Sequence, residues 1–192
     1  EYVAALLAAP AFAAQITHHA VLPEEPAAFG KPVRPLPTAL TGVLGHMGIE
    51  RLYSHQAQAM DSLRSGRHVV ASVPTAGGKS LIYNLPVVER FLHDPESTSL
   101  YLFPLKALAQ DQLAAFAAMT EHWPKAGRPS AAVYDGDTTP HFRKKIREHP
   151  PTALFTNPEM LHLALLPHHP LWTTFFAGLS FVVVDEVHTY RG

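Results

Sequence analysis

Short, unbroken apolar runs alternate with helix-like stretches from residue 67 to the end of the chain. The runs of strand length lie at 68–73, 99–103, 131–134, 153–156 and 179–185. Strands that are covered by helices on both faces are apolar throughout, whereas half-exposed strands alternate apolar and polar positions. Strands that alternate with helices are joined by right-handed crossovers and form a parallel sheet. The pattern therefore predicts an α/β fold, with a mostly parallel sheet and helices on both of its faces.

The helical stretches that separate these strands lie at 79–92, 105–119, 142–148 and 159–166. The part of the chain before them has a different character. An Ala- and Leu-rich helix is predicted at 2–15, and five prolines between residues 21 and 38 predict an extended segment. Further helices are predicted at 38–47 and 54–64. We therefore expect a helical and extended lead-in before the α/β fold.

The length and composition of the chain suit one packed domain with a short appendage. It has 192 residues, of which 47% are hydrophobic. We divide it into the lead-in, residues 1–47, and the α/β domain, residues 48–192. A net charge of −1 argues against a surface that is basic overall, so any nucleic-acid surface must be local. The absence of cysteine excludes disulfides and thiolate metal sites.

The apolar stretch 4–14 raises the question of a membrane segment. It lacks a preceding basic region and is too short to cross a bilayer, so we expect neither a signal peptide nor a membrane partner. We expect a cytoplasmic location, associated with the nucleoid if the organism is bacterial. The chain begins with Glu1 and ends at Gly192, shortly after a strand end that carries candidate catalytic residues. We therefore expect a piece of a longer protein.

A candidate phosphate-binding loop follows the first predicted strand. Residues 73–80 match the pattern G-x-x-x-x-G-K-[ST], except that valine replaces the first glycine. Small residues let backbone N–H groups point at phosphate oxygens, a lysine reaches the β and γ phosphates, and a hydroxyl binds Mg²⁺. The helix that begins there adds the positive end of its dipole. The residues expected to bind the nucleotide are Thr75, Ala76, Gly77, Gly78, Lys79, Ser80 and Leu81.

Two carboxylates follow the last predicted strand. Asp185 and Glu186 stand at its carboxyl end, and ligands bind at that edge of an open parallel sheet. We expect Ser80 and Asp185 to hold Mg²⁺, and Glu186 to polarise the attacking water, with Lys79 as the third catalytic residue. Solvated acids at a strand end are common, but the phosphate loop is predicted at the same edge. The two segments together therefore predict a site that binds and hydrolyses ATP.

Four segments resemble the first RecA-like domain of superfamily 2 DExH-box helicases. They are the Asp-Glu-Val-His box at 185–188, a motif Ia-like segment at 104–112, Thr-Asn-Pro-Glu-Met-Leu at 156–161 and a Q-motif-like segment at 52–56. The likeness covers roughly residues 48 to 192 and stops after the Asp-Glu box, with no later helicase motif. Within this superfamily, the chain is similar to the MrfA-type and Hrq-type mitomycin-repair DNA helicases.

The resemblance implies roles for further residues. Gln56 and Tyr53 would recognise adenine, and His188 would couple the nucleotide state to the nucleic acid. Single-stranded DNA would lie along a track that includes Lys106, Gln112, Gly136, Asp137, Thr156 and Asn157. A second RecA-like domain would complete the site in the whole protein, which would be a 3′-to-5′ DNA helicase acting in DNA repair. Half a cleft cannot complete the charge shell around the phosphates, so we expect the chain alone to hydrolyse ATP barely.

Two other classes of protein remain as alternatives. A P-loop ATPase of another class, such as a small-molecule kinase or a transport ATPase, would lack the segments at 104–112 and 156–161. A non-catalytic nucleic-acid-binding domain would have a decayed site, and the retained lysine, serine and carboxylates argue against decay. A nucleotide-binding titration with and without Mg²⁺ separates these classes.

Overall fold

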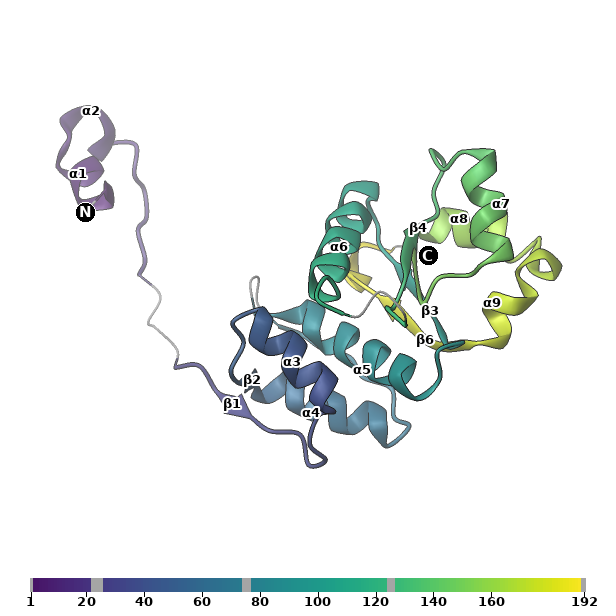
Figure 1. Ribbon diagram of the computed structural model, residues 1–192. Helices are drawn as coiled ribbons and strands as arrows, with labels where there is room; N and C mark the ends of the chain where they lie inside the picture. Colours follow the sequence, from purple (N-terminus) through teal and green to yellow (C-terminus); the bar gives the residue numbers. More distant parts are fainter. Residues whose placement is uncertain (1, 22–25, 74–76, 124–126, 191–192) are drawn as a thin grey trace.

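Four parallel strands form the main sheet, one fewer than the five that the sequence predicts. The structure, a computed structural model, describes residues 2–21, 26–73, 77–123 and 127–190 (Figure 1). The strands are β3 (Thr98–Leu102), β4 (Ala131–Val133), β5 (Ala153–Thr156) and β6 (Leu179–Val184), in the spatial order β4-β5-β3-β6. All three neighbouring pairs are parallel. Thr75 and Ala76 of the predicted phosphate loop lie outside the described residues.

Helices cover both faces of this sheet, because successive strand residues point to opposite sides. One face packs against α5 (Lys79–His93) and α6 (Lys106–Met119), and α3 (Thr38–His46) and α4 (Ser54–Arg64) pack against α5. The other packs against α7 (Pro140–Glu148), a π-helix (Leu161–Leu165), a 3₁₀ turn (His169–Trp172) and α9 (Thr173–Ala177). In Figure 1 the sheet lies between these two groups. The α/β prediction with helices on both faces is confirmed.

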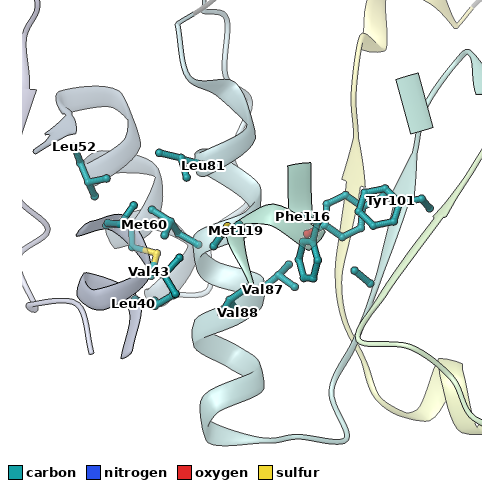
Figure 2. Close-up of a cluster of buried hydrophobic side chains, with 14 of the residues drawn as sticks. Leu40, Val43, Leu52, Met60, Leu81, Val87, Val88, Tyr101, Phe116 and Met119 are labelled. Atoms are coloured by element: carbon teal, nitrogen blue, oxygen red, sulfur yellow. The ribbon is translucent and has the colours of Figure 1, made fainter. Parts of the chain in front are cut away.

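The larger core lies on the α5 side of the sheet. Figure 2 shows it running from Leu40 and Met60, past Val87 on α5, to Tyr101 on β3. All four side chains are buried. Because Leu40 belongs to α3, the end of the predicted lead-in packs into the same core as the α/β domain. Burying side chains of this size contributes roughly 1.5–3 kcal/mol each.

The lead-in is fastened to the domain before it reaches α3. Strand β1 (Phe29–Gly30) pairs antiparallel with β2 (Leu52–Tyr53), which directly precedes α4. The Val33 N–H donates to both carboxylate oxygens of Asp61, each at 3.0 Å. Arg64 forms a buried ion pair with Glu89 and donates to the carbonyl oxygens of residues 34 and 35. We call Asp61, Arg64 and Glu89 the lead-in clamp.

The strand predicted at 68–73 is absent. These residues have no strand structure, although they lie beside β6 and share with it the lining of a cavity of about 160 Å³. On the same strand, Val182 and Val184 are 54% and 45% exposed. Four of these six residues, His68, Val70, Ala71 and Ser72, are exposed. The run therefore lacks the burial on both faces that the prediction of a covered strand assumed.

Two helix predictions need smaller corrections. The helix predicted at 2–15 is divided into α1 (Tyr2–Ala8) and α2 (Pro10–Ala13), because proline lacks the N–H that a continuous helix requires and begins the second helix instead. The helix predicted at 159–166 is a short α8 (Pro158–Met160) followed by the π-helix. In the described part of the chain, no helix is both long and apolar enough to cross a bilayer.

Candidate nucleotide site and nucleic-acid track

The phosphate-loop lysine and the carboxylates after β6 meet at one place. Lys79 begins α5, and Glu186 follows 107 residues later, yet the Lys79 Nζ lies 3.1 Å from the Glu186 Oε1. Asp185 and Lys79 line the same 160 Å³ cavity. Glu186 follows the carboxyl end of β6, the edge where ligands bind in an open parallel sheet, and the start of α5 lies beside that end. The predicted convergence of the two segments is present in the structure.

The described end of the phosphate loop is held by α4. Gln56 is buried; its side-chain Nε2 donates to the carbonyl of Gly78 at 2.9 Å, and its Oε1 accepts from the Tyr53 N–H at 2.9 Å. Gly78 has φ +71°, and a Cβ there would lie 2.5 Å from the Gln56 Nε2. Only glycine fits this position without strain. The His55 Nε2 donates to the carbonyl of Gly77 at 3.0 Å. Gln56 therefore positions the loop, and its contact with adenine stays a prediction.

A column of aromatic rings stands beside the loop. Tyr53 is stacked on Phe29, with ring centroids 5.4 Å apart, and on His55 at 5.5 Å. The guanidinium of Arg51 lies 3.9 Å from the centroid of the Phe29 ring. The sequence analysis selected Tyr53 but missed Phe29 and Arg51, because the strand pairing of β1 with β2 cannot be seen in a two-residue strand. The column gives the predicted adenine side of the site a flat apolar wall.

A tight turn places the two carboxylates. The Asp185 N–H donates to the carbonyl of Leu102 at 3.0 Å, which continues the sheet by one residue, and the Asp185 Oδ1 accepts from the Glu186 N–H at 3.0 Å. Glu186 has φ +49°, a left-handed conformation that costs on the order of 1–3 kcal/mol in a residue with a side chain. This turn directs Glu186 toward Lys79. His188 is exposed, with its Nδ1 3.5 Å from the Glu186 Oε2.

The residues present suit a magnesium-bound triphosphate. Mg²⁺ is usually held by one or two carboxylates together with substrate phosphates and water. Asp185, which lines the cavity with Lys79, and the half-buried Ser80, which follows Lys79 in the chain, are oxygen donors of the required type. Leu81 is buried and anchors the first turn of α5 in the core. The set Lys79, Ser80 and Asp185 therefore fits the predicted ligand.

Two tyrosines near the carboxylates were missed by the sequence analysis. Tyr83 lines the cavity with Lys79 and Asp185; burial raises the pKa of its hydroxyl, and the nearby charges of Asp185 and Glu186 raise it further. The same causes raise the pKa of Tyr190, whose hydroxyl donates to the carbonyl of Leu102 at 3.2 Å. Both hydroxyls therefore stay protonated at neutral pH. The signal for Tyr83 was its spacing, because residues four apart share a helix face.

Three residues of the predicted nucleic-acid track lie together. The Lys106 Nζ lies 2.7 Å from the Asp137 Oδ2, and the two side chains are 50% and 80% exposed. The hydrogen bond with Asp137 raises the pKa of Lys106. A Cβ at Gly136 would lie 3.5 Å from the Lys106 Nζ, so this glycine also borders the lysine. Lys106 and Asp137 thus form an exposed pair beside Gly136, in the loop that follows β4.

The other three residues of the predicted track form hydrogen bonds within the protein. Thr156 is buried, and its hydroxyl donates to the carbonyl of Tyr134 at 2.6 Å, so the hydroxyl is not presented at the surface. The Asn157 Oδ1 accepts from the Met160 N–H at 2.8 Å and caps α8. The Gln112 Oε1 accepts from the Tyr83 hydroxyl at 2.9 Å. The role of these residues in binding nucleic acid stays a prediction.

Comparisons with known proteins agree with this geometry. Residues 53–192 match the profile of the DEAD/DEAH box helicase family. The chain is 42% identical over 182 residues to the ATP-dependent helicase HRQ1 of Saccharomyces cerevisiae, a match that covers 94% of this chain and 16% of HRQ1. It is 43% identical over 164 residues to the uncharacterized ATP-dependent helicase YprA of Bacillus subtilis, covering 83% of this chain and 21% of YprA. Its fold matches the crystal structure of the DUF1998 helicase MrfA bound to DNA and AMPPNP with a TM-score of 0.81 and 40% identity, over 88% of this chain and 23% of MrfA.

Proposed function

Because this chain belongs to the DEAD/DEAH box helicase family, we propose that it is the ATP-binding half of an ATP-dependent DNA helicase. One observation carries the proposal: the Lys79 Nζ lies 3.1 Å from the Glu186 Oε1, at the edge of the sheet where a P-loop protein binds a triphosphate. The chain spans only about 16% to 23% of the length of the relatives named above. The activity of the whole protein is therefore part of the proposal.

The roles of the residues follow from their positions. Lys79 donates to the β and γ phosphates, and the N–H groups at the start of α5 bind the same oxygens. Ser80 and Asp185 would hold Mg²⁺, which would neutralise charge on the phosphates. Glu186 orients the attacking water and accepts its proton. Glu186 must first release Lys79, because the lysine that binds phosphate is paired with it in this structure.

On the proposed nucleic-acid track, Lys106 exchanges its carboxylate partner for a phosphate in a similar way. Lys106 is paired with Asp137 and lies on the exposed surface, so a DNA phosphate can replace Asp137 as its partner. Such contacts are made to the backbone and carry no sequence information. Gly136 allows the DNA backbone to approach, and Asn157 and the neighbouring backbone contribute polar groups. His188, exposed and 3.5 Å from Glu186, is the proposed coupling residue.

We extend the proposal to 3′-to-5′ polarity, a role in DNA repair and a cytoplasmic or nucleoid location. The support is the family resemblance together with the similarity to HRQ1 and to MrfA bound to DNA. The polarity is tested with the full-length protein by unwinding duplexes that carry a 3′ or a 5′ single-stranded tail. Unwinding of the 3′-tailed duplex alone is the expected result, and preference for the 5′ tail would contradict it.

A second RecA-like domain is the proposed partner of this one, and it supplies the cation that completes the charge shell. An arginine supplied from outside the domain contributes on the order of 10³-fold or more to comparable phosphoryl-transfer reactions. The test compares ATP turnover by the full-length protein and by residues 1–192, each with and without single-stranded DNA. We expect DNA-stimulated turnover by the full-length protein and hardly any by residues 1–192. Vigorous DNA-stimulated turnover by residues 1–192 would contradict the proposal.

A further inference from the structure

Tyr83 stands between the nucleotide site and the nucleic-acid track. It lies one turn after Lys79 on α5 and lines the cavity that Lys79 and Asp185 share. Its hydroxyl does not point to the carboxylates for a hydrogen bond; it donates to the Gln112 Oε1 at 2.9 Å. Gln112 lies on α6, the helix that begins at Lys106. One hydrogen bond therefore joins the helix of the phosphate lysine to the helix of the track lysine.

The position of the Tyr83 ring is fixed by its neighbours. The ring meets Tyr101 edge to face, with centroids 5.7 Å apart and an interplanar angle of 80°. Tyr101 is buried, donates its hydroxyl to the Asn84 Oδ1 at 3.0 Å, and is stacked on Phe155 at 4.5 Å. The ring of Tyr83 cannot swing freely because these groups are packed against the core. Its hydroxyl is thereby held toward α6.

The protonation state of the hydroxyl suits a permanent donor. Burial and the nearby carboxylates Asp185 and Glu186 both raise the pKa of Tyr83, so the hydroxyl keeps its proton throughout the physiological range. The Gln112 Oε1 can accept at any pH, because an amide does not titrate there. The hydrogen bond between α5 and α6 therefore does not depend on pH, and its strength depends on how the two helices sit relative to each other.

We propose that Tyr83 and Gln112 are a positioning pair that couples the nucleotide affinity of this domain to its DNA affinity. The inference rests on the proposed function, since it requires that both ligands bind. Nucleotide binding shifts Lys79 and the start of α5, and DNA binding shifts Lys106 and the start of α6. With the bond in place, the two helices move together or the bond is lost. Gln112 thus acts from inside the domain rather than as a contact to DNA.

The test measures the coupling directly in the full-length protein. The affinity for a non-hydrolysable ATP analogue with Mg²⁺ is measured with and without a single-stranded DNA oligonucleotide, and the ratio is the coupling factor. By linkage, the analogue must change the DNA affinity by the same factor. Coupling factors of about 5- to 150-fold are typical. Since one hydrogen bond is equivalent to roughly 2- to 10-fold in an equilibrium constant, Tyr83→Phe is expected to lower the factor by that amount.

A double-mutant cycle distinguishes this role from a general loss of stability. Gln112→Leu should lower the coupling factor as much as Tyr83→Phe, and the double variant should show no further loss, because each removes the same bond. Tyr101→Phe is the matched control: it also removes a tyrosine hydroxyl from the same cluster, but the coupling factor should stay at the wild-type value. Thermal unfolding of all four variants shows which of them lose stability.

The outcomes separate this inference from the proposed function. If the wild-type protein binds neither ligand, both proposals are overturned, whereas binding of both ligands without coupling overturns the positioning pair alone. A coupled wild type whose factor survives in Tyr83→Phe and Gln112→Leu overturns the positioning pair alone. Equal losses of coupling in Tyr83→Phe and Tyr101→Phe also overturn it, because the effect would then follow from disturbing the aromatic cluster.

Discussion

Two lysine–carboxylate pairs lie at the starts of neighbouring helices, one in the proposed nucleotide site and one on the proposed nucleic-acid track. The Lys79–Glu186 pair spans 3.1 Å, with side chains that are 35% and 30% exposed, and the Lys106–Asp137 pair spans 2.7 Å, with side chains that are 50% and 80% exposed. The shorter pair is the more exposed one. Water and salt screen an exposed pair, so its contribution to stability is small whatever the distance between its atoms. The exposed fraction of the side chains, rather than the distance between N and O, therefore indicates which pair is more strongly held.

The comparison indicates how each lysine exchanges partners. Release of Lys106 from Asp137 costs little, so under the proposed function DNA phosphates would replace the carboxylate readily and the binding would depend on salt. Lys79 is more enclosed, so losing Glu186 without a replacement is less favourable. A triphosphate replaces that lost charge and at the same time frees Glu186 to act on water. The predictions below test this contrast, beginning with the largest expected effect.

The first prediction concerns the enclosed carboxylate. Glu186→Gln removes the proton acceptor but keeps the shape of the side chain, so ATP hydrolysis by the full-length protein should fall by about 10²- to 10⁴-fold. Nucleotide affinity should be retained or rise, since Lys79 is no longer held by a negative charge. Steady-state turnover and an equilibrium titration measure the two effects. Loss of binding in parallel with turnover would show that Glu186 is needed to build the site rather than to act on water.

The second prediction concerns the enclosed lysine. Lys79→Ala removes the cation that reaches the phosphates, and ATP turnover should fall by about 10²- to 10³-fold, as for other single donors to developing charge. Unlike Glu186→Gln, it should also weaken nucleotide binding. Lys144→Ala is the control, because that lysine is exposed on α7, which packs on the other face of the sheet. Turnover that survives Lys79→Ala would break the assignment of the phosphate loop.

The third prediction extends the contrast to the lead-in clamp, whose Arg64 and Glu89 side chains are only 10% and 7% exposed. Removing one partner of a buried pair costs about 3–5 kcal/mol, because the other charge is left without compensation. Arg64→Met should lower the free energy of unfolding by up to that amount, because the exposed Arg34, whose Nη2 lies 3.7 Å from the Glu89 Oε2, remains as a partner. The double variant Arg64→Met with Glu89→Leu should recover much of the loss. Denaturant unfolding measures both. A larger loss in the double variant would contradict the buried-charge explanation.

The fourth prediction has the smallest expected effect. Lys106→Met should weaken the binding of single-stranded DNA by the full-length protein and lower the slope of log affinity against log salt by about 1, as for one phosphate contact. Asp137→Asn should leave the affinity unchanged or raise it slightly, because it frees the lysine. Binding is measured at several salt concentrations. An unchanged salt slope in Lys106→Met would place the lysine outside the track.

Contacts that follow from the order of strands in the sheet could be predicted from the sequence. Contacts that depend on how helices pack against each other could not. The meeting of Lys79 with Glu186 follows from one rule about the edge of a parallel sheet. The bond between Tyr83 and Gln112 depends on how α5 and α6 lie against each other, which apolar periodicity does not specify. The strand predicted at 68–73 failed for a related reason: an apolar run predicts burial, but the partner strands decide whether a strand forms.

The lead-in shows the same limit. Five prolines between residues 21 and 38 predicted an extended segment. The clamp that fastens it, and the stacking of Phe29 on Tyr53, join residues more than 20 positions apart that have no shared pattern. Such contacts become visible only when the chain is folded. The domain boundary placed after residue 47 stays a prediction, although α3 packs into the core of the α/β domain.

The central claim is that the loop at 77–80 and the carboxylates at 185–186 bind one magnesium-bound triphosphate. The most direct test is an equilibrium titration of the full-length protein with an ATP analogue, with and without Mg²⁺, in the wild type and in Asp185→Asn. We predict that Mg²⁺ strengthens binding to the wild type and that Asp185→Asn removes most of this strengthening. The same Mg²⁺ dependence in both proteins would contradict a shared site.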